Sequence, residues 1–347
     1  MRILVTGGAG FIGSHTCIAL LKKGYEIVVL ESFENSYEES LRRINKIIKF
    51  KKTNLCLYTA DIRNEEMLEK LFSKSIKIKK PIKAVLHFAG LKSVSESIKN
   101  PLLYWDVNFN GSLKLLKIMN KFDCRTIVFS SSATIYGPIN VSPLKEDAII
   151  QPITPYGETK YAVEKLLNNI QQSNKNEWRV ANLRYFNPIG AHPSGLIGES
   201  PLGVPNNIFP YITQVASGIH NKLKVFGNDW PTKDGTGVRD YIHIMDLAEG
   251  HIAALEYLLK NKSQIININL GTGIGTTVLE LINIFQDKNK IKIPFEIKNR
   301  RDGDLPIVIA DNTFALSCLD WSPKRNLYDM CGDGWKWQKL NPKGYLN

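Results

Sequence analysis

The chain has 347 residues, of which 43% are hydrophobic and 22% charged, and it carries 45 Lys and Arg against 33 Asp and Glu. This composition excludes a disordered, collagen-like or coiled-coil protein, and the length suggests about two domains of ordinary size. The net charge of +12 raises nucleic acid or an anionic membrane as a partner. Most of the excess lies between Leu41 and Lys83, where thirteen basic residues stand against four acids.

This basic segment carries no nucleic-acid-binding motif, and its lysines alternate with Ile and Asn rather than with aromatic residues and glycines. We therefore interpret it as the solvated faces of two helices. The five cysteines form no C-x-x-C pair, so neither a disulfide framework nor a zinc site is indicated. No window resembles a signal peptide or a transmembrane helix. We expect a cytoplasmic protein with no metal, no membrane and no nucleic acid as a partner.

The first 190 residues alternate short apolar runs with helical patterns. Such runs of apolar or β-branched residues are typical of strands buried on both faces. Alternation of strands and helices indicates an α/β fold with a parallel, doubly wound sheet. The expected strands are 2–6, 26–31, 55–60, 84–89, 126–130 and 180–185, and the expected helices are 14–23, a lysine-rich segment after Ser40, 65–73, 101–120 and 156–172.

The texture of the sequence changes after about Asn187. Residues 188–210 are rich in Gly, Pro, Ser and Asn, which predicts loops that line a site. Helical patterns follow at 211–217, 245–260 and 277–286. We therefore expect a doubly wound domain over 1–187, with 238–262 packing back on it, and a smaller C-terminal α/β substrate domain over 188–347.

A glycine-rich segment at residues 7–13, GGAGFIG, lies between the first expected strand and the first expected helix. Glycines at 7, 10 and 13 allow a tight turn and a close approach of the backbone to a pyrophosphate at the helix N-terminus. Glu31 ends the second expected strand, and its carboxylate can accept hydrogen bonds from ribose hydroxyls while repelling a 2′-phosphate. Because no arginine follows at 32 or 33, these residues predict a Rossmann-type domain that binds NAD rather than NADP.

Tyr156 and Lys160 are four residues apart and share one face of an expected helix. A free phenol has a pKa of about 10 and is a poor base at neutral pH. A nearby ammonium group and an oxidised nicotinamide would both stabilise the phenolate and lower that pKa. The Y-x-x-x-K spacing is common by itself, but here it follows a strand that ends in Ser130, Ser131 and Ser132, whose hydroxyls can hold a substrate oxygen.

With further specific segments, these motifs resemble the UDP-glucose 4-epimerases (UDP-galactose 4-epimerases) of the extended short-chain dehydrogenase/reductase family. The resemblance runs from Met1 to the Trp-rich tail at 334–338. It implies reversible epimerisation of UDP-glucose and UDP-galactose at C4 through a transient 4-keto sugar and bound NAD, in galactose metabolism, by a homodimer. The segments that carry it are 87–92 (HFAGLK), 130–137 (SSSATIYG), 183–188 (LRYFNP), 190–195 (GAHPSG) and 234–243 (DGTGVRDYIH).

The resemblance also implies a role for each matching residue. Tyr156 would be the catalytic base and acid, Lys160 would tune its pKa, and Ser132 would hold the sugar hydroxyl. Two arginines suit a diphosphate, because each guanidinium can bind oxygens bidentately. The positions that match cofactor contacts are Gly7, Gly10, Phe11, Ile12, Gly13, Glu31, Asp61, Ile62, Phe88, Ala89, Lys92, Asn108, Tyr156, Lys160 and Phe186. Those that match UDP-sugar contacts are Ser132, Tyr156, Asn187, Asn207, Lys224, Val225, Phe226, Arg239, Arg301 with the rest of 301–304, Asp304 and Val308.

The sequence departs from the family pattern at two places. Glu31-Ser32 replaces the Asp-Asn that commonly follows the second strand, and the longer carboxylate should keep its role. Val308 stands where some members carry a large aromatic residue, and a small side chain there is associated with acceptance of N-acetylated sugars. We therefore expect room for UDP-N-acetylhexosamines.

Several alternatives remain open at this point. A nucleotide-sugar 4,6-dehydratase would share the fold and the Tyr–Lys pair, but it needs an acid where Ala133 and Thr134 stand. A UDP-uronate 4-epimerase would need a partner for the C6 carboxylate, and we identify none. An NAD-sensing binding module would be expected to lose Tyr156 or Lys160, and both are present. A nucleic-acid-binding protein would bind random oligonucleotides in a salt-dependent manner.

Overall fold

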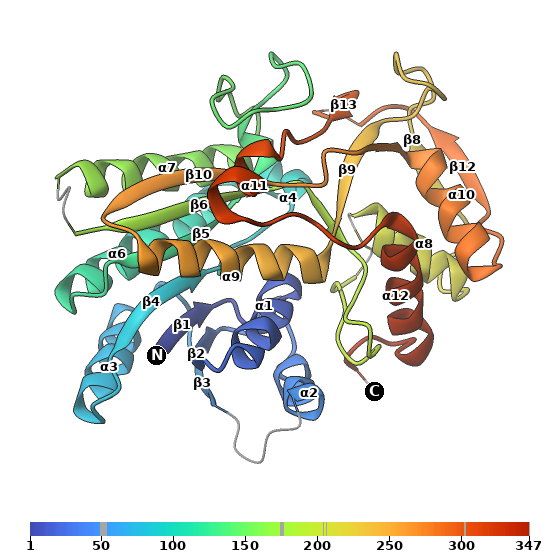
Figure 1. Cartoon of the computed structure of the whole chain (residues 1–347). Helices are drawn as coiled ribbons and strands as arrows, with labels where there is room; N and C mark the ends of the chain where they lie inside the picture. The colour runs from blue at the N-terminus through green and yellow to red at the C-terminus, as the bar shows by residue number, and fades with distance from the viewer. Residues whose placement is uncertain (49–53, 174–176, 204, 206, 302, 347) are drawn as a thin grey trace. The chain divides into compact units, whose positions relative to one another are not determined.

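The computed structural model describes residues 1–48, 54–173, 177–203, 205, 207–301 and 303–346 (Figure 1). Lys49, Lys51 and Lys52 of the basic segment lie outside these residues. In the part of the chain that the structure describes, no helix is long and apolar enough to cross a membrane. The chain divides into two discontinuous compact units: unit 1 comprises Met1–Gly137, Ile150–Arg184 and Ala248–Ile268, and unit 2 comprises Pro138–Ile149, Tyr185–Leu247 and Asn269–Asn347.

Unit 1 is built on a seven-stranded sheet in the order β10-β6-β5-β4-β1-β2-β3. Strands β5, β4, β1, β2 and β3 pair in parallel, which confirms the predicted doubly wound sheet. The chain order reverses between β4 and β1, and such sheets bind ligands outside the carboxyl ends of their strands at this point. The strands are β1 (Arg2–Thr6), β2 (Glu26–Glu31), β3 (Leu55–Thr59), β4 (Ile82–His87), β5 (Thr126–Ser132), β6 (Arg179–Tyr185) and β10 (Gln264–Leu270).

Helices cover the sheet of unit 1 on two faces. Apolar side chains of α3, α6 and α7 form one core with alternate strand residues, among them Phe72, Leu115, Phe129 and Leu167. Helices α1 and α9 lie on the other face (Figure 1). The helices are α1 (Phe11–Lys22), α2 (Glu38–Ile48), α3 (Glu65–Lys77), α4 (Val94–Lys99), α5 (Pro101–Tyr104), α6 (Gly111–Lys121), α7 (Pro155–Ser173) and α9 (Ile244–Lys260), the last beginning in unit 2, with a 3-10 turn η2 (Ala133–Ile135).

The helix predicted at 101–120 is interrupted by a π-helical turn, η1 (Trp105–Asn110), between α5 and α6. Asn108 lies on this turn, and its side-chain amide forms two hydrogen bonds with the backbone of Leu91. It accepts from the Leu91 N–H at 2.8 Å and donates to the Leu91 carbonyl at 3.1 Å. The same amide donates to the Thr159 hydroxyl at 3.1 Å. The wide turn therefore ties the loop after β4 to α7, and such turns are frequent at functional sites.

Unit 2 contains two small sheets, β11-β9-β13 with β7 beside β9, and β12-β8. Its core includes Phe209, Ile212, Leu281, Phe285 and Met330. The sequence predicted helices in the regions of α8 and α10 but none of these strands and neither α11 nor α12. The elements are β7 (Asn187–Ile189), α8 (Ile208–Ala216), β8 (Leu223–Phe226), β9 (Val238–His243), β11 (Gly275–Thr277), α10 (Val278–Asn289), β12 (Phe295–Lys298), β13 (Ile307–Val308), α11 (Thr313–Leu319) and α12 (Leu327–Leu340).

Candidate active site

The glycine-rich loop joins β1 to α1 with little space to spare. Gly7 has a φ of 72°, and a Cβ at this position would lie 2.7 Å from the backbone nitrogen of Ala89. A Cβ on Gly13 would lie 2.2 Å from the carbonyl oxygen of Gly7, whereas one on Gly10 meets that oxygen at 3.4 Å, an ordinary contact. Gly10 precedes α1 without a side-chain cap, and the first turn contains no acid. The amides and dipole of this helix end therefore suit an anion.

The carboxylate of Glu31 is held against the same loop. It accepts hydrogen bonds from the N–H groups of Ala9 at 2.9 Å, Ser32 at 3.1 Å and Phe33 at 3.4 Å. Burial raises the pKa of Glu31, while these backbone hydrogen bonds lower it. The predicted ribose acceptor thus lies where β2 ends, beside the start of α1.

Three other residues predicted to contact the cofactor, Asp61, Phe88 and Ala89, lie just beyond the carboxyl ends of β3 and β4. Phe88 and Ala89 follow β4, and the Phe88 ring lies 4.9 Å from the ring of His251. Asp61 follows β3 and accepts hydrogen bonds from the Arg63 guanidinium at 2.6 and 2.9 Å. These hydrogen bonds are the main reason why the pKa of Asp61 is lowered. Ile62 is buried in the core. Lys92 is exposed, and the Asn108 side-chain amide is hydrogen-bonded to Leu91 and Thr159. Phe186 belongs to unit 2.

Tyr156, Lys160 and Ser132 meet where β5 ends against the first turns of α7. Lys160 donates from Nζ to the carbonyl of Ser130 at 2.8 Å, and this nitrogen lies 5.8 Å from the centre of the Tyr156 ring. Burial raises the pKa of Tyr156, and a hydrogen bond with Ser132 lowers it. Burial also lowers the pKa of Lys160 to about 8. Without a further positive charge the phenol therefore stays protonated, so the cluster is suited to work beside a cationic group.

The same helix contains a second Tyr–Lys pair with the same spacing. Lys165 Nζ lies 5.4 Å from the centre of the Tyr161 ring, a distance close to that in the first pair. Lys165 is exposed, however, whereas Lys160 is only 5% exposed. The spacing alone therefore does not define the site; burial and the neighbouring Ser132 distinguish the first pair from the second.

Unit 2 brings together several residues predicted to contact the UDP-sugar. Arg239 donates from Nη1 to the carbonyl of Leu305 at 2.8 Å, and its Nη2 lies 3.9 Å from Asp304. Arg301 donates to the other oxygen of Asp304 at 3.3 Å, and its guanidinium lies 4.5 Å from the centre of the Phe226 ring. Val308 pairs with Arg239 across β13 and β9. Asp304 thus links Arg239 and Arg301, and the Arg301 guanidinium covers the Phe226 ring.

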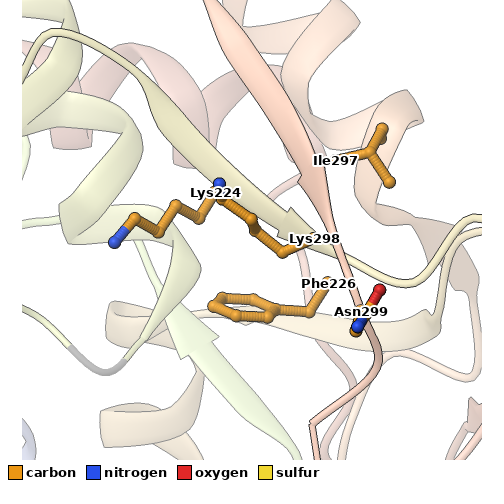
Figure 2. Close-up of a pocket in the computed structure, with 5 residues that line it drawn as sticks. All are labelled: Lys224, Phe226, Ile297, Lys298 and Asn299. Atoms are coloured by element: carbon orange, nitrogen blue, oxygen red, sulfur yellow. The ribbon is translucent and has the colours of Figure 1, made fainter.

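A pocket of about 470 Å³ lies beside these residues, on β8 and β12. Figure 2 shows Lys224 and Phe226 extending to the same side of β8. Val225 points instead into the core, so it offers only its backbone to a ligand. The pocket is lined by Lys224, Phe226, Ile297, Lys298 and Asn299 (Figure 2).

The remaining predicted residues lie elsewhere in unit 2. Asn187 pairs with Tyr241 across β7 and β9. Asn207 directly precedes α8 and donates to Glu199 at 3.3 Å. Among the described residues, no hydrogen bond or ion pair joins Asn207 to Arg239 or Arg301. Residue 302, within the predicted 301–304 segment, lies outside the described residues.

One buried ion pair, on the same helix as the Tyr–Lys pair, was not predicted from the sequence. Arg184 in β6 and Glu164 in α7 are 1% and 5% exposed. An arginine within an otherwise apolar strand is a signal for such a pair, because a buried charge needs a partner. Glu164 is also four residues beyond Lys160, on the same side of the helix.

Features outside these clusters have structural explanations. The described lysines of the basic segment are exposed, and Lys80 pairs with Glu26 at 2.5 Å. Among the described residues, no group of three His, Cys, Asp or Glu could hold a metal ion. All five cysteines are free thiols: Cys17, Cys56, Cys124, Cys318 and Cys331.

A parallel sheet with a glycine loop before its first helix, and a Tyr–Lys pair with a buried lysine beside a serine at the carboxyl edge, defines a Rossmann-type domain of the short-chain dehydrogenase/reductase class. A family model described as GDP-mannose 4,6 dehydratase matches residues 4–333. The UDP-glucose 4-epimerase of Bacillus subtilis (strain 168) is 49% identical over 345 residues, which covers 99% of both chains. The chain belongs to the UDP-glucose 4-epimerase family of the extended short-chain dehydrogenases/reductases.

Solved structures agree with this assignment over the whole chain. The UDP-glucose 4-epimerase of Stenotrophomonas maltophila, with bound NAD and formylated UDP-arabinopyranose, has a TM-score of 0.94 at 46% identity and 99% coverage of both chains. The enzyme of Bifidobacterium longum, in complex with NAD+ and UDP, has a TM-score of 0.92 at 40% identity. Coverage there is 99% of this chain and 100% of that chain.

Proposed function

We propose that this protein is an NAD-dependent isomerase that interconverts UDP-glucose and UDP-galactose by inverting C4, a reaction of galactose metabolism. The observation that carries the proposal is the cluster of Tyr156, Lys160 and Ser132 at the carboxyl edge of a dinucleotide-binding sheet. The identity of 49% over 99% of a UDP-glucose 4-epimerase supports the same activity.

The residues of unit 1 fit NAD. The open side of Gly10 and the uncapped start of α1 suit the pyrophosphate, and the Glu31 carboxylate at the end of β2 suits the ribose hydroxyls. Bound NAD supplies the hydride acceptor and donor for C4. We propose unit 1 as the NAD-binding part of the chain and unit 2 as the part that binds the UDP-sugar.

The chain's own residues move the proton. Tyr156 takes the proton of the 4-hydroxyl while C4 is oxidised, and it returns the proton to the oxygen when the 4-keto sugar is reduced on its other face. Ser132 hydrogen-bonds the phenol and can hold the same sugar oxygen. Lys160, fixed by the carbonyl of Ser130, places a positive charge near the phenolate and stabilises it.

Unit 2 supplies cations and an aromatic surface for UDP. We propose that Arg239 and Arg301 bind the diphosphate, because guanidinium groups match phosphate oxygens in charge and geometry. Phe226 and Lys224 line the adjacent pocket and suit a flat base and an anion. Val308, partly exposed on β13 beside Arg239, leaves space that an N-acetyl group can occupy, so we propose that UDP-GlcNAc and UDP-GalNAc are also substrates.

The alternative activities are not favoured. Ala133 and Thr134 form the turn after β5, where a dehydratase needs an acid. The relative from Bacillus subtilis is an epimerase by name, and both the partly buried Tyr156 and the buried Lys160 are present. Among the described residues we identify none that favours a uronate epimerase, and none that favours a binding module that only senses NAD.

We propose a homodimer in the cytoplasm. Helices α4 and α5 and the start of η1 expose large apolar side chains, including Ile98 at 56% and Leu102 at 84%. Val94, Leu103 and Trp105 extend this surface. A second copy would bury it, and contiguous apolar surface of this kind marks interaction sites. The molar mass by light scattering tests the dimer, and a monomer at micromolar concentration would contradict it.

The activity test uses purified protein with no added cofactor. UDP-galactose should be converted to UDP-glucose, because the cofactor is restored in each turnover and stays bound. Acid-released NAD should be close to one per chain. Conversion that requires an added reductant would contradict the proposal, and so would a 4-keto-6-deoxy product.

A further inference from the structure

The buried ion pair of Glu164 and Arg184 connects three elements of unit 1. Arg184 in β6 donates from Nε and Nη2 to the two oxygens of Glu164 in α7, at 3.1 and 2.8 Å. Its Nη1 donates to the Tyr136 hydroxyl at 3.0 Å, and its guanidinium lies 5.2 Å from the centre of that ring. Glu164 also accepts from the Ser131 hydroxyl at 2.5 Å. The pair therefore joins β6, α7 and the end of β5.

These contacts lie directly beside the residues of the proposed reaction. Tyr156, Lys160 and Glu164 are four residues apart along α7 and share one side of the helix. Lys160 binds the carbonyl of Ser130, and Glu164 binds the hydroxyl of Ser131. The segment that ends in Ser132 is thus fixed to α7 at two successive residues. A shift of α7 against β5 would break both bonds and separate the phenol from the serine hydroxyl.

We propose that Glu164 and Arg184 are positioning residues: their ion pair fixes α7 against the ends of β5 and β6 so that Tyr156, Lys160 and Ser132 meet in the geometry of proton transfer. This inference rests on the proposed function. Neither residue contacts the reacting atoms. A single hydrogen-bonded acceptor would hold Ser131, but two parallel bonds from a planar guanidinium also fix the rotation of Glu164, and hence of the helix face.

The ion pair carries no net charge, and Glu164 lies eight residues beyond Tyr156 along α7. The titratable groups around Tyr156 are Lys160 in α7, Tyr104 in α5, whose ring is 6.5 Å away and whose hydroxyl binds Glu96 in α4, and His87 in β4, close enough to Lys160 to interact electrostatically. Arg184 and Glu164 cancel each other's charge. Glu164→Gln would leave the Arg184 charge unbalanced, whereas Glu164→Leu/Arg184→Met removes both charges. In the double variant the displaced phenol loses the hydrogen bond with Ser132 that lowers its pKa, so the pKa of Tyr156 should rise.

The test compares Glu164→Gln with Glu39→Gln, which removes the acid from another ion pair of unit 1, Arg43–Glu39 at 2.9 Å on α2. Both variants should lose thermal stability. For Glu164→Gln, kcat per NAD-loaded site should fall by about 10- to 100-fold, the usual cost of a misplacement near 1 Å, with KM for UDP-galactose unchanged. Glu39→Gln should keep the kcat of the wild type. Equal kcat per loaded site in all three proteins would overturn the proposal.

A second readout needs no turnover. In the NAD-loaded protein, tyrosinate absorbance against pH, with the same curve for the Tyr156→Phe background subtracted, isolates Tyr156. Its midpoint should lie at higher pH in the double variant Glu164→Leu/Arg184→Met than in the wild type, and an unchanged midpoint would overturn the inference. An inactive wild type with NAD bound would refute the proposed function, and this titration would still decide the role of Glu164.

If Glu164→Gln does not fold, the double variant Glu164→Leu/Arg184→Met carries the test, because it buries no unpaired charge. It should fold, show the same loss of kcat, and show a raised midpoint of Tyr156, because the hydrogen bond with Ser132 is lost. Wild-type kcat in this double variant would mean that the pair has no positioning role.

Discussion

Replacing Gly13 by alanine should damage the fold itself, whereas the same change at Gly10 should damage only cofactor binding. A Cβ on Gly13 would lie 2.2 Å from the oxygen of Gly7 and 2.8 Å from Cα of Gly8, and both are backbone atoms that no side-chain rotation can move. An ordinary contact at the first of these is about 3.4 Å or more, so the loop and α1 must separate by roughly 1 Å. Overpacking of this kind costs about 1–3 kcal/mol.

Gly10 is the matched control in the same loop. A Cβ there meets the same oxygen at 3.4 Å, and its φ of −68° is open to alanine. Its methyl group would, however, occupy the side of the loop proposed for the pyrophosphate. Thermal unfolding of the NAD-free protein should show a loss of about 2–4 °C per kcal/mol for Gly13→Ala and little change for Gly10→Ala. Titration with NAD should show weaker binding for both. Equal melting temperatures of the two NAD-free variants would refute this reasoning.

Three further changes test other parts of the account. Burial lowers the pKa of His87 to about 3, whereas the ordinary value is about 6.5. Between these two values only the unfolded chain takes up the proton, so the free energy of unfolding should decrease as the pH falls, by up to about 1.4 kcal/mol per pH unit. Urea unfolding from pH 6.5 to 4.5 should show a smaller dependence on pH in His87→Gln than in the wild type. Lys160→Met should raise the apparent pKa that governs kcat, because a positive charge near the phenol is lost, whereas Lys165→Met should leave the pH profile unchanged. Val308→Tyr should lower turnover of UDP-GalNAc relative to UDP-galactose by at least about tenfold, and an unchanged ratio would show that this position does not limit the substrate.

Most elements of unit 1 could be predicted from the sequence because their signals are local, but strand β10 and helix α4 were not predicted. The six expected strands are runs of β-branched and apolar residues that need both faces covered, and all six are present within a few residues of the expected bounds. The glycine motif is equally local, since Gly7 and Gly13, which pack against each other, are six positions apart. A resemblance to a known family added the roles of residues that are distant in the sequence.

The features that the sequence did not predict depend on contacts between distant residues. The strands of unit 2 are two to six residues long and pair with residues 35 to 72 positions away, so they leave little periodic signal. The π-helical turn adds one residue to a single turn of a helix, which a pattern of apolar residues does not register. Arg184 reaches Tyr136 across 48 residues, so its role became visible only in the folded chain.

The most direct test of the central claim compares Tyr156→Phe with Tyr161→Phe. The two tyrosines are five residues apart on α7, and each is followed by a lysine four residues later. Both NAD-loaded variants are assayed for conversion of UDP-galactose to UDP-glucose. Loss of the proton-transfer group in Tyr156→Phe should lower kcat by about 10²- to 10⁴-fold, while Tyr161→Phe should retain wild-type turnover. Turnover near the wild-type value in Tyr156→Phe would contradict the assignment of Tyr156 as the base and acid of the reaction.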